Sequence, residues 1–237
     1  MRSVAVIQHE PSVPPGSITE VLEQHDIEHF VLEAWREQSW PTPGDLSGLV
    51  VLGGTMNVDE LDRYPFLKKS RDLMAGAIES GIPTLGVCLG SQMMARVLGA
   101  EVFRASPRNA LFSRVVVTEP DDPIVAAFAS DTPVLQFHED TFTVPPDAVP
   151  LATSAASGLA QAFRYGDSAY AIQFHFEVDR PIIEQWCQDI GDDSLVAEWG
   201  TSTDQLLGGA DRYAEPAYDA GKKLMARFLA LKTAAVR

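Results

Sequence analysis

The chain has 237 residues, 46% of them apolar, and this size and composition suit one globular domain with a substantial core. Its 18 basic and 33 acidic residues give a formal net charge of −15, which disfavours nucleic acid as a partner because phosphate recognition draws on clustered lysine and arginine. The acidic residues are dispersed, and we assign most of them to a solvated surface.

The sequence offers no targeting or membrane signal. The N-terminal apolar run ends at Gln8, which is too short for a signal peptide, and no run approaches the ~20 residues of a membrane helix. Cys88 and Cys187 are far apart and lack metal-ligand spacing, so neither a disulfide framework nor a zinc site is expected. We expect a cytoplasmic protein that has no membrane partner.

The first hundred residues alternate apolar runs with helical patterns, which is typical of a parallel sheet wrapped by helices. Strands are expected at residues 3–8, 27–32, 49–52 and 82–87. Helices are expected at residues 18–25, 66–80 and 92–98.

The middle of the chain changes character. Pro, Asp and Gly turns separate short β-like runs, which predict an antiparallel extension of the sheet. These runs lie at residues 114–118, 134–137, 149–153, 158–164 and 169–174. Helices return from Pro181, and the last is an amphipathic stretch at 218–231. We expect a single α/β domain over residues 1–237, with a C-terminal helical segment at about 181–237.

The stretch GVCLGSQ, residues 86–92, puts Cys88 between two glycines where a strand gives way to a helix. Such a turn is typical of a nucleophile elbow, in which Gly86 and Gly90 leave room where side chains would crowd the backbone. The helix N-terminus favours the thiolate, and the Leu89 amide is suited to donate to an oxyanion. The motif alone leaves a structural core cysteine as an alternative. Cys187 has no glycine neighbours and is expected in the core.

A thiol nucleophile needs a base and a group that orients the base. His175 closes the last β-like run, and Glu177 returns to the same side of an extended chain two residues later. Glu177 could therefore hold one imidazole nitrogen while the other faces Cys88. The alternative is a surface strand end that happens to carry a histidine and a glutamate.

Three stretches together carry a resemblance: LVVLGGTM at 49–56, GVCLGSQ at 86–92 and AIQFHFE at 171–177. In this order and separation they resemble the class I (triad) glutamine amidotransferases. The resemblance implies a flavodoxin-like doubly wound fold with helices on both faces of a mostly parallel sheet. The loop DELDRYPFL and the segment FHEDTFTVPPDA are similar to stand-alone relatives of the GMP synthetase amidotransferase domain, a group that includes γ-glutamyl peptidases.

By this resemblance Cys88, His175 and Glu177 form a catalytic triad that hydrolyses a γ-glutamyl amide through a γ-glutamyl thioester, without metal or organic cofactor. Ammonia and glutamate are the expected products when the substrate is glutamine. The backbone amides of Gly54 and Leu89 are expected to hold the oxyanion.

Further substrate contacts are expected from four residues: Gly53, Gln92, His138 and Asp140. The family glutamine that matches Gln92 contacts the substrate; otherwise Gln92 is an ordinary first-turn glutamine. His138 and Asp140 could bind the glutamyl α-amino end, or could equally stabilise a strand-to-loop turn.

Three hypotheses of function remain open. The chain lacks a G-x-x-x-x-G-K-[ST] loop for ATP, so it is either a glutaminase subunit that serves a separate synthetase or a free-standing hydrolase or peptidase of γ-glutamyl compounds. A catalytically silent binding or regulatory module is the third hypothesis, against which the intact Cys, His and Glu set speaks. A cysteine-dependent α/β-hydrolase is disfavoured, because its acid precedes its histidine in the chain. We favour the first hypothesis, with glutamine as the substrate.

Overall fold

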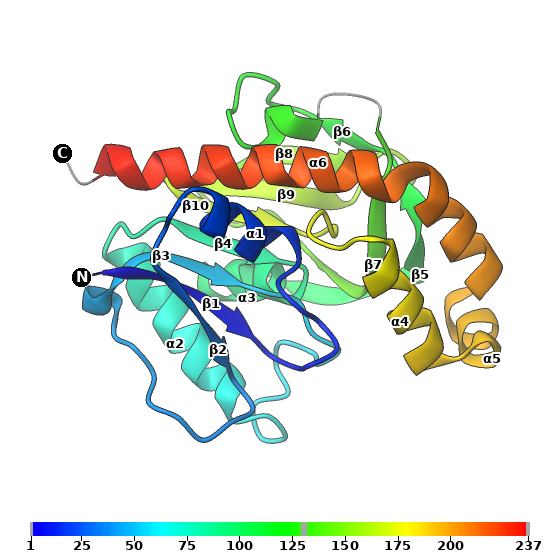
Figure 1. Ribbon diagram of the computed structural model, residues 1–237, viewed down its shortest axis with the longest axis horizontal. Coiled ribbons are helices and arrows are strands. Elements are labelled where there is room, and N and C mark those ends of the chain that lie inside the picture. Colours follow the sequence, from blue (N-terminus) through cyan, green and yellow to red (C-terminus); the bar gives the residue numbers. More distant parts are fainter. Residues whose placement is uncertain (1, 129–131, 236–237) are drawn as a thin grey trace.

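In the computed structural model, which describes residues 2–128 and 132–235, the chain forms an α/β fold around an eight-stranded sheet (Figure 1). The strand order is β2-β1-β3-β4-β10-β9-β8-β6. Pairs from β2 to β10 are parallel and pairs from β10 to β6 are antiparallel, which confirms the expected parallel sheet with an antiparallel extension. The strands are β1 Ser3–Gln8, β2 His29–Glu33, β3 Leu46–Val51, β4 Thr84–Val87, β6 Val115–Val117, β8 Ala148–Ser154, β9 Ala160–Tyr165 and β10 Ala169–Ile172.

Helices cover both faces of the sheet, because alternate residues of its buried strands point to opposite sides. Val4 and Val6 pack in one core cluster with α1 and α6, whereas Ala5 and Ile7 pack in another with α2 and α3. Figure 1 shows α6 running along one face of the sheet. The helices are α1 Ser17–Gln24, α2 Phe66–Glu79, α3 Leu89–Val97, α4 Arg180–Ile190, α5 Asp192–Ser194 and α6 Thr203–Ala235, with short 3₁₀ turns at Pro43–Asp45 and Val125–Phe128 and a π-helical turn, η3, at Leu195–Trp199.

A separate two-stranded antiparallel ribbon is formed by β5 Val102–Ser113 and β7 Val134–Phe142. The expectation that the run at 134–137 extends the main sheet is wrong, because β7 pairs with β5 instead. No strand was expected over β5, whose sequence contains Pro107 and whose pairing shifts register between Arg104 and Asn109. The ribbon matters for function because β7 passes beside Cys88.

The C-terminal helical segment also differs in extent from the sequence expectation. α6 begins at Thr203 rather than near residue 218, and it continues through Pro216. Within the described residues, no helix is both long and apolar enough to cross a membrane.

Candidate active site

Cys88 occupies a strained turn between β4 and α3. Its backbone has φ 50° and ψ −109°, a conformation that residues with a side chain rarely adopt. A Cβ on Gly86 would lie 2.4 Å from the Gly90 carbonyl oxygen, and a Cβ on Gly90 would lie 2.0 Å from the Val51 carbonyl oxygen. Both positions therefore require glycine, which confirms the expectation that side chains would crowd this turn.

The Cys88 sulfur is buried but borders a cavity. Its Sγ lies 4.0 Å from the carbonyl oxygen of Phe137 on β7. α3 begins at the next residue, so the first backbone N–H groups of the helix lack intrahelical partners. Among the described residues, neither Leu89 N–H nor Gly54 N–H donates a hydrogen bond. Two free amides thus lie on the segments that flank Cys88.

His175 lies three residues beyond β10 and is fixed by two hydrogen bonds. Its backbone N–H donates to the Leu135 carbonyl at 2.9 Å, and its Nδ1 lies 2.7 Å from Glu177 Oε1. The other Glu177 oxygen accepts from the Phe176 N–H at 2.9 Å, and both the histidine and the glutamate are almost fully buried. Burial disfavours the charged ring, but Glu177 and Cys88 outweigh this effect and raise the pKa of His175.

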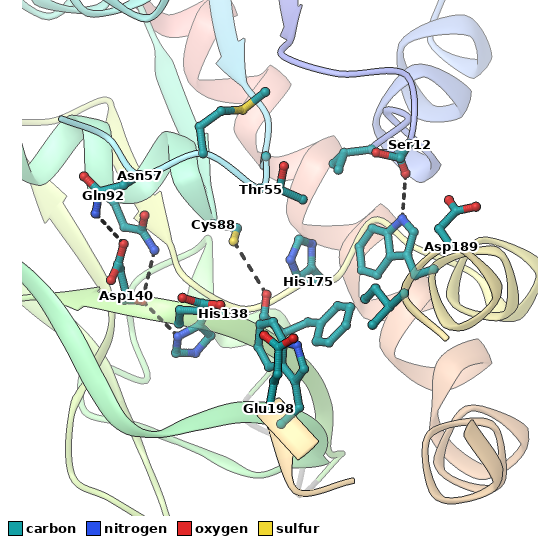
Figure 2. A pocket seen from close by; sticks show the side chains of 18 of the residues that line it. Ser12, Thr55, Asn57, Cys88, Gln92, His138, Asp140, His175, Asp189 and Glu198 are labelled. Carbon is teal, nitrogen blue, oxygen red and sulfur yellow. Dashed lines mark hydrogen bonds between the residues drawn. The ribbon is translucent and has the colours of Figure 1, made fainter. Parts of the chain in front are cut away.

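The three residues expected to form the triad are brought together around Gly53. A Cβ on Gly53 would lie 3.3 Å from His175 Cε1 and 3.5 Å from Cys88 Cβ. Figure 2 shows the His175 ring beside the Cys88 sulfur. Gly53 therefore permits the close approach of the histidine and the cysteine, and a larger residue there would separate them.

His9 holds the neighbouring peptide from behind. Burial lowers the pKa of His9 to about 4, so its ring is neutral near pH 7. Its Nδ1 donates to the Gly53 carbonyl at 3.4 Å, and its Nε2 therefore accepts from the Ser70 hydroxyl at 3.0 Å. The carbonyl and the following N–H of a trans peptide point in opposite directions, so this contact directs the Gly54 N–H away from His9. Sequence analysis missed this role of His9.

Gln92 and Asp140 form a polar end of the cavity with Asn57. Gln92 Nε2 donates to the Asp140 carbonyl at 3.0 Å and lies 3.3 Å from Gln173 Oε1. Asn57 Nδ2 donates to Asp140 Oδ2 at 2.6 Å (Figure 2). Asn57 was not expected from the sequence, although it directly follows the LVVLGGTM stretch.

His138 also lines the cavity, but both of its ring nitrogens have partners inside the protein. Nδ1 lies 3.0 Å from the Asp140 carbonyl, and Nε2 lies 2.9 Å from Gln136 Oε1. Burial lowers the pKa of His138 to about 4, which leaves the ring neutral. These bonds favour the alternative in which His138 stabilises the backbone around Asp140.

The cavity has a volume of about 590 Å³. It is lined by six of the expected site residues, namely Gly54, Cys88, Gln92, His138, Asp140 and His175. Its other end is aromatic, with Phe137, Trp186 and Trp199 in the lining. Sequence analysis placed the segment around Trp186 in the core, and no local pattern distinguishes a core tryptophan from one that borders a cavity. Within the described part of the chain, no group of His, Cys, Asp and Glu is arranged to hold a metal ion.

Comparison with known proteins agrees with this geometry. A family model described as glutamine amidotransferase class-I matches residues 21–181. The chain belongs to this family. This class I glutamine amidotransferase is 34% identical over 136 residues to a glutamine-hydrolyzing GMP synthase subunit of Thermoplasma acidophilum, and the match covers 56% of the chain and 64% of the relative. It is 32% identical over 100 residues to a glutamine-hydrolyzing GMP synthase of Thermus thermophilus, where the match covers 42% of the chain but 20% of the relative. The chain thus spans less than two thirds of the length of either relative.

Solved structures extend the likeness over nearly the whole amidotransferase chain. A glutamine amidotransferase from Thermotoga maritima superposes with a TM-score of 0.85 at 29% identity, covering 96% of this chain and 98% of that one. A glutamine amidotransferase from Methylobacillus flagellatus shares the fold with a TM-score of 0.87 at 23% identity, covering 98% of this chain and 95% of that one. The expected family and its likeness to the glutamine-hydrolyzing part of GMP synthase are thus confirmed.

Proposed function

We propose that this chain hydrolyses γ-glutamyl amides, with glutamine as the simplest substrate, through Cys88, His175 and Glu177. The observation that carries the proposal is the buried Glu177–His175 hydrogen bond of 2.7 Å beside a cysteine on a strained strand-to-helix turn. A carboxylate, an imidazole and a thiol in this arrangement supply an orienting group, a proton carrier and a nucleophile.

The reaction proceeds in two halves. The Cys88 sulfur bonds to the γ-carbonyl carbon, and the oxyanion accepts hydrogen bonds from Leu89 N–H and Gly54 N–H, where one such donor contributes about 3–4 kcal/mol. His175 gives its proton to the leaving nitrogen, the carbon–nitrogen bond breaks, and ammonia departs from glutamine. Water then attacks the thioester while His175 takes its proton, the carbon–sulfur bond breaks, and glutamate leaves.

The polar end of the cavity suits the amino-acid head of the substrate. The Asp140 carboxylate, fixed by Asn57, offers an acceptor for the α-ammonium group. Arg104 lines the same end, with its Nε 4.0 Å from Asp140 Oδ1, and offers a cation for the α-carboxylate. Opposite charges side by side match the zwitterionic head of glutamine.

A separate synthetase subunit is the acceptor that we propose for the ammonia. The support is similarity to proteins named as subunits of glutamine-hydrolyzing GMP synthase, from Thermoplasma acidophilum and from Methanococcus maripaludis. In this arrangement glutamine hydrolysis would be slow without the partner, because coupling avoids wasting glutamine.

Glutamate release by the purified chain tests the chemistry. Cys88→Ala and His175→Ala should each lower turnover by at least about 10³-fold, whereas Glu177→Gln should retain part of it because it disturbs orientation. Cys187→Ala serves as the matched control and should keep wild-type turnover, since burial raises the pKa of Cys187 and keeps its thiol protonated.

Mass mapping after treatment with a diazo-ketone analogue of glutamine gives a second readout. The adduct should form on Cys88. An adduct on Cys187 alone would overturn the nucleophile assignment, and full turnover in His175→Ala with loss in His138→Ala would move the base to His138. A chain that is folded, inactive and unlabelled would be the silent module.

A further inference from the structure

The cavity continues beyond Cys88, on the side away from Gln92, into a compartment that glutamine does not need. Figure 2 shows Asn57, Gln92 and Asp140 on one side of Cys88, and Asp189 on the other side, beyond His175. The whole cavity, about 590 Å³, falls in the range of roughly 300–1,000 Å³ that is typical of sites for drug-sized ligands. The amino-acid head and the scissile amide occupy only its polar end.

Three aromatic side chains from separate elements wall this second compartment. Phe137 of β7 is stacked with Trp186 of α4 at a ring-centroid distance of 5.5 Å, and it packs against Trp199 of η3 at 4.8 Å. Trp186 in turn meets the His175 ring edge-on at 5.0 Å. The aromatic wall therefore begins at the group that protonates the leaving nitrogen.

The second compartment is supplied mainly by the C-terminal part of the chain. Trp186 and Trp199 both lie beyond residue 181, where the match to the family model ends, whereas Cys88 and His175 lie within it. The reacting groups thus come from the family-matched part, and the wall that a leaving group would meet comes mainly from outside it. This division is typical of a site whose chemistry is shared and whose specificity is particular.

Charge at this end disfavours an anionic leaving group. Asp189 and Glu198 both line it. Glu198 is paired with Arg108 at 2.8 Å, but Asp189 accepts only from the Gln185 amide at 2.8 Å and has no ion pair among the described residues. A γ-glutamyl peptide would bring its own carboxylate towards Asp189, and like charges repel.

A cationic leaving group is less well matched than a neutral ring. The Arg108 guanidinium already lies over the Trp199 ring, 5.5 Å from its centroid, so this tryptophan has a cation partner. A flat neutral ring needs no charged partner and gains from edge or offset contact with Phe137 and Trp186.

We propose that the aromatic compartment is a leaving-group subsite for amines that carry an aromatic ring, so that the chain prefers γ-glutamyl amides of such amines to glutamine. This inference rests on the proposed hydrolysis. The carbon–nitrogen bond of the amide breaks, the nitrogen takes the proton from His175, and the aromatic amine leaves past Trp186 and Trp199. Water resolves the Cys88 thioester to glutamate.

The test compares kcat/KM for γ-glutamyl benzylamide, γ-glutamyl methylamide and glutamine. The wild-type chain should favour the benzylamide over the methylamide by about tenfold or more, the effect of one good aromatic contact. Trp199→Ala should reduce this ratio about tenfold, because Trp199 touches Phe137 but makes no ring contact with His175. Trp199→Phe should keep most of the preference.

Trp40→Ala is the matched control, since Trp40 is also a partly buried tryptophan beside a cation, Lys69, but lies outside the cavity. It should leave the benzylamide-to-methylamide ratio unchanged. Cleavage of glutamine and both amides at similar kcat/KM, or an unchanged ratio in Trp199→Ala, would overturn the subsite while leaving the proposed hydrolysis intact. Failure to cleave any of the three would overturn the hydrolysis itself, and the subsite with it.

Discussion

His9 is a buried residue whose side chain acts through a backbone peptide rather than on the substrate. Its hydrogen bond to the Gly53 carbonyl directs the Gly54 N–H away from His9, and Gly54 lines the cavity beside Cys88. His9→Ala should lower kcat for glutamine about 10- to 100-fold while KM changes little, because an oxyanion donor matters most in the transition state.

Two further measurements separate this role from a general loss of structure. Alkylation of Cys88 by iodoacetamide forms no oxyanion and should keep its wild-type rate in His9→Ala. Ser70→Ala, which removes the hydroxyl bonded to His9 Nε2, should show a smaller loss of kcat. Equal losses in KM, kcat and alkylation would indicate local unfolding instead.

The two neutral histidines of the site make folding sensitive to acid. Burial lowers the pKa of both His9 and His138 from 6.5 to about 4, so between these values the unfolded chain binds more protons than the folded one. The free energy of unfolding should therefore fall as pH falls from about 6.5 to about 4. Urea titrations at several pH values should show a shallower decline in His138→Gln, which carries no titratable group; equal slopes would contradict the assignment.

At the scale of elements, buried parallel strands were the easiest features to predict. β1 spans Ser3–Gln8 as expected, because its residues are buried between two helical layers and form one apolar run. β2 begins at His29, two residues late, since the Ile27 N–H closes the turn after α1 by bonding to Leu22. As an edge strand with exposed Phe30 and Val31, it carries a weaker pattern.

Elements that depend on distant partners could not be predicted from local pattern. β5 exists because β7 pairs with it, and its sequence shows neither strict alternation nor a continuous apolar run. The motif residues of the site were found in the sequence because glycine, cysteine and histidine at fixed spacing reflect local geometry. Trp186 was missed as a cavity residue, because its place depends on a bond to the Ser12 carbonyl, 174 residues away.

Two adjacent glycines in α6 give an internal comparison at this scale. A Cβ on Gly209 would lie 2.7 Å from Phe112 Cδ2 on β5, whereas a Cβ on Gly208 would approach only the end of Arg212, at 3.8 Å. Gly208→Ala should stabilise the chain by up to about 1 kcal/mol through helix propensity. Gly209→Ala should destabilise it by about 1–3 kcal/mol through overpacking. Chemical denaturation measures both, and two effects of the same sign would contradict this packing.

For the whole molecule, we propose that the chain folds as one domain. α6 packs against α1, α4 and the β5–β7 ribbon, so it ties the C-terminal segment to both the sheet and the site. Thermal unfolding followed by far-ultraviolet circular dichroism and by tryptophan fluorescence should show one coincident transition. Two separated transitions would place a domain boundary before α4.

The position of α6 also sets the order in which the molecule can be completed during synthesis. Val4 and Val6 of β1 are buried in the same cluster as Leu224 and Phe228 of α6. α6 leaves the ribosome after every strand of the sheet, at a synthesis rate of about 5–20 residues per second. One face of the nascent sheet therefore stays uncovered for many seconds, and chaperones that shield apolar surface have that interval in which to bind it.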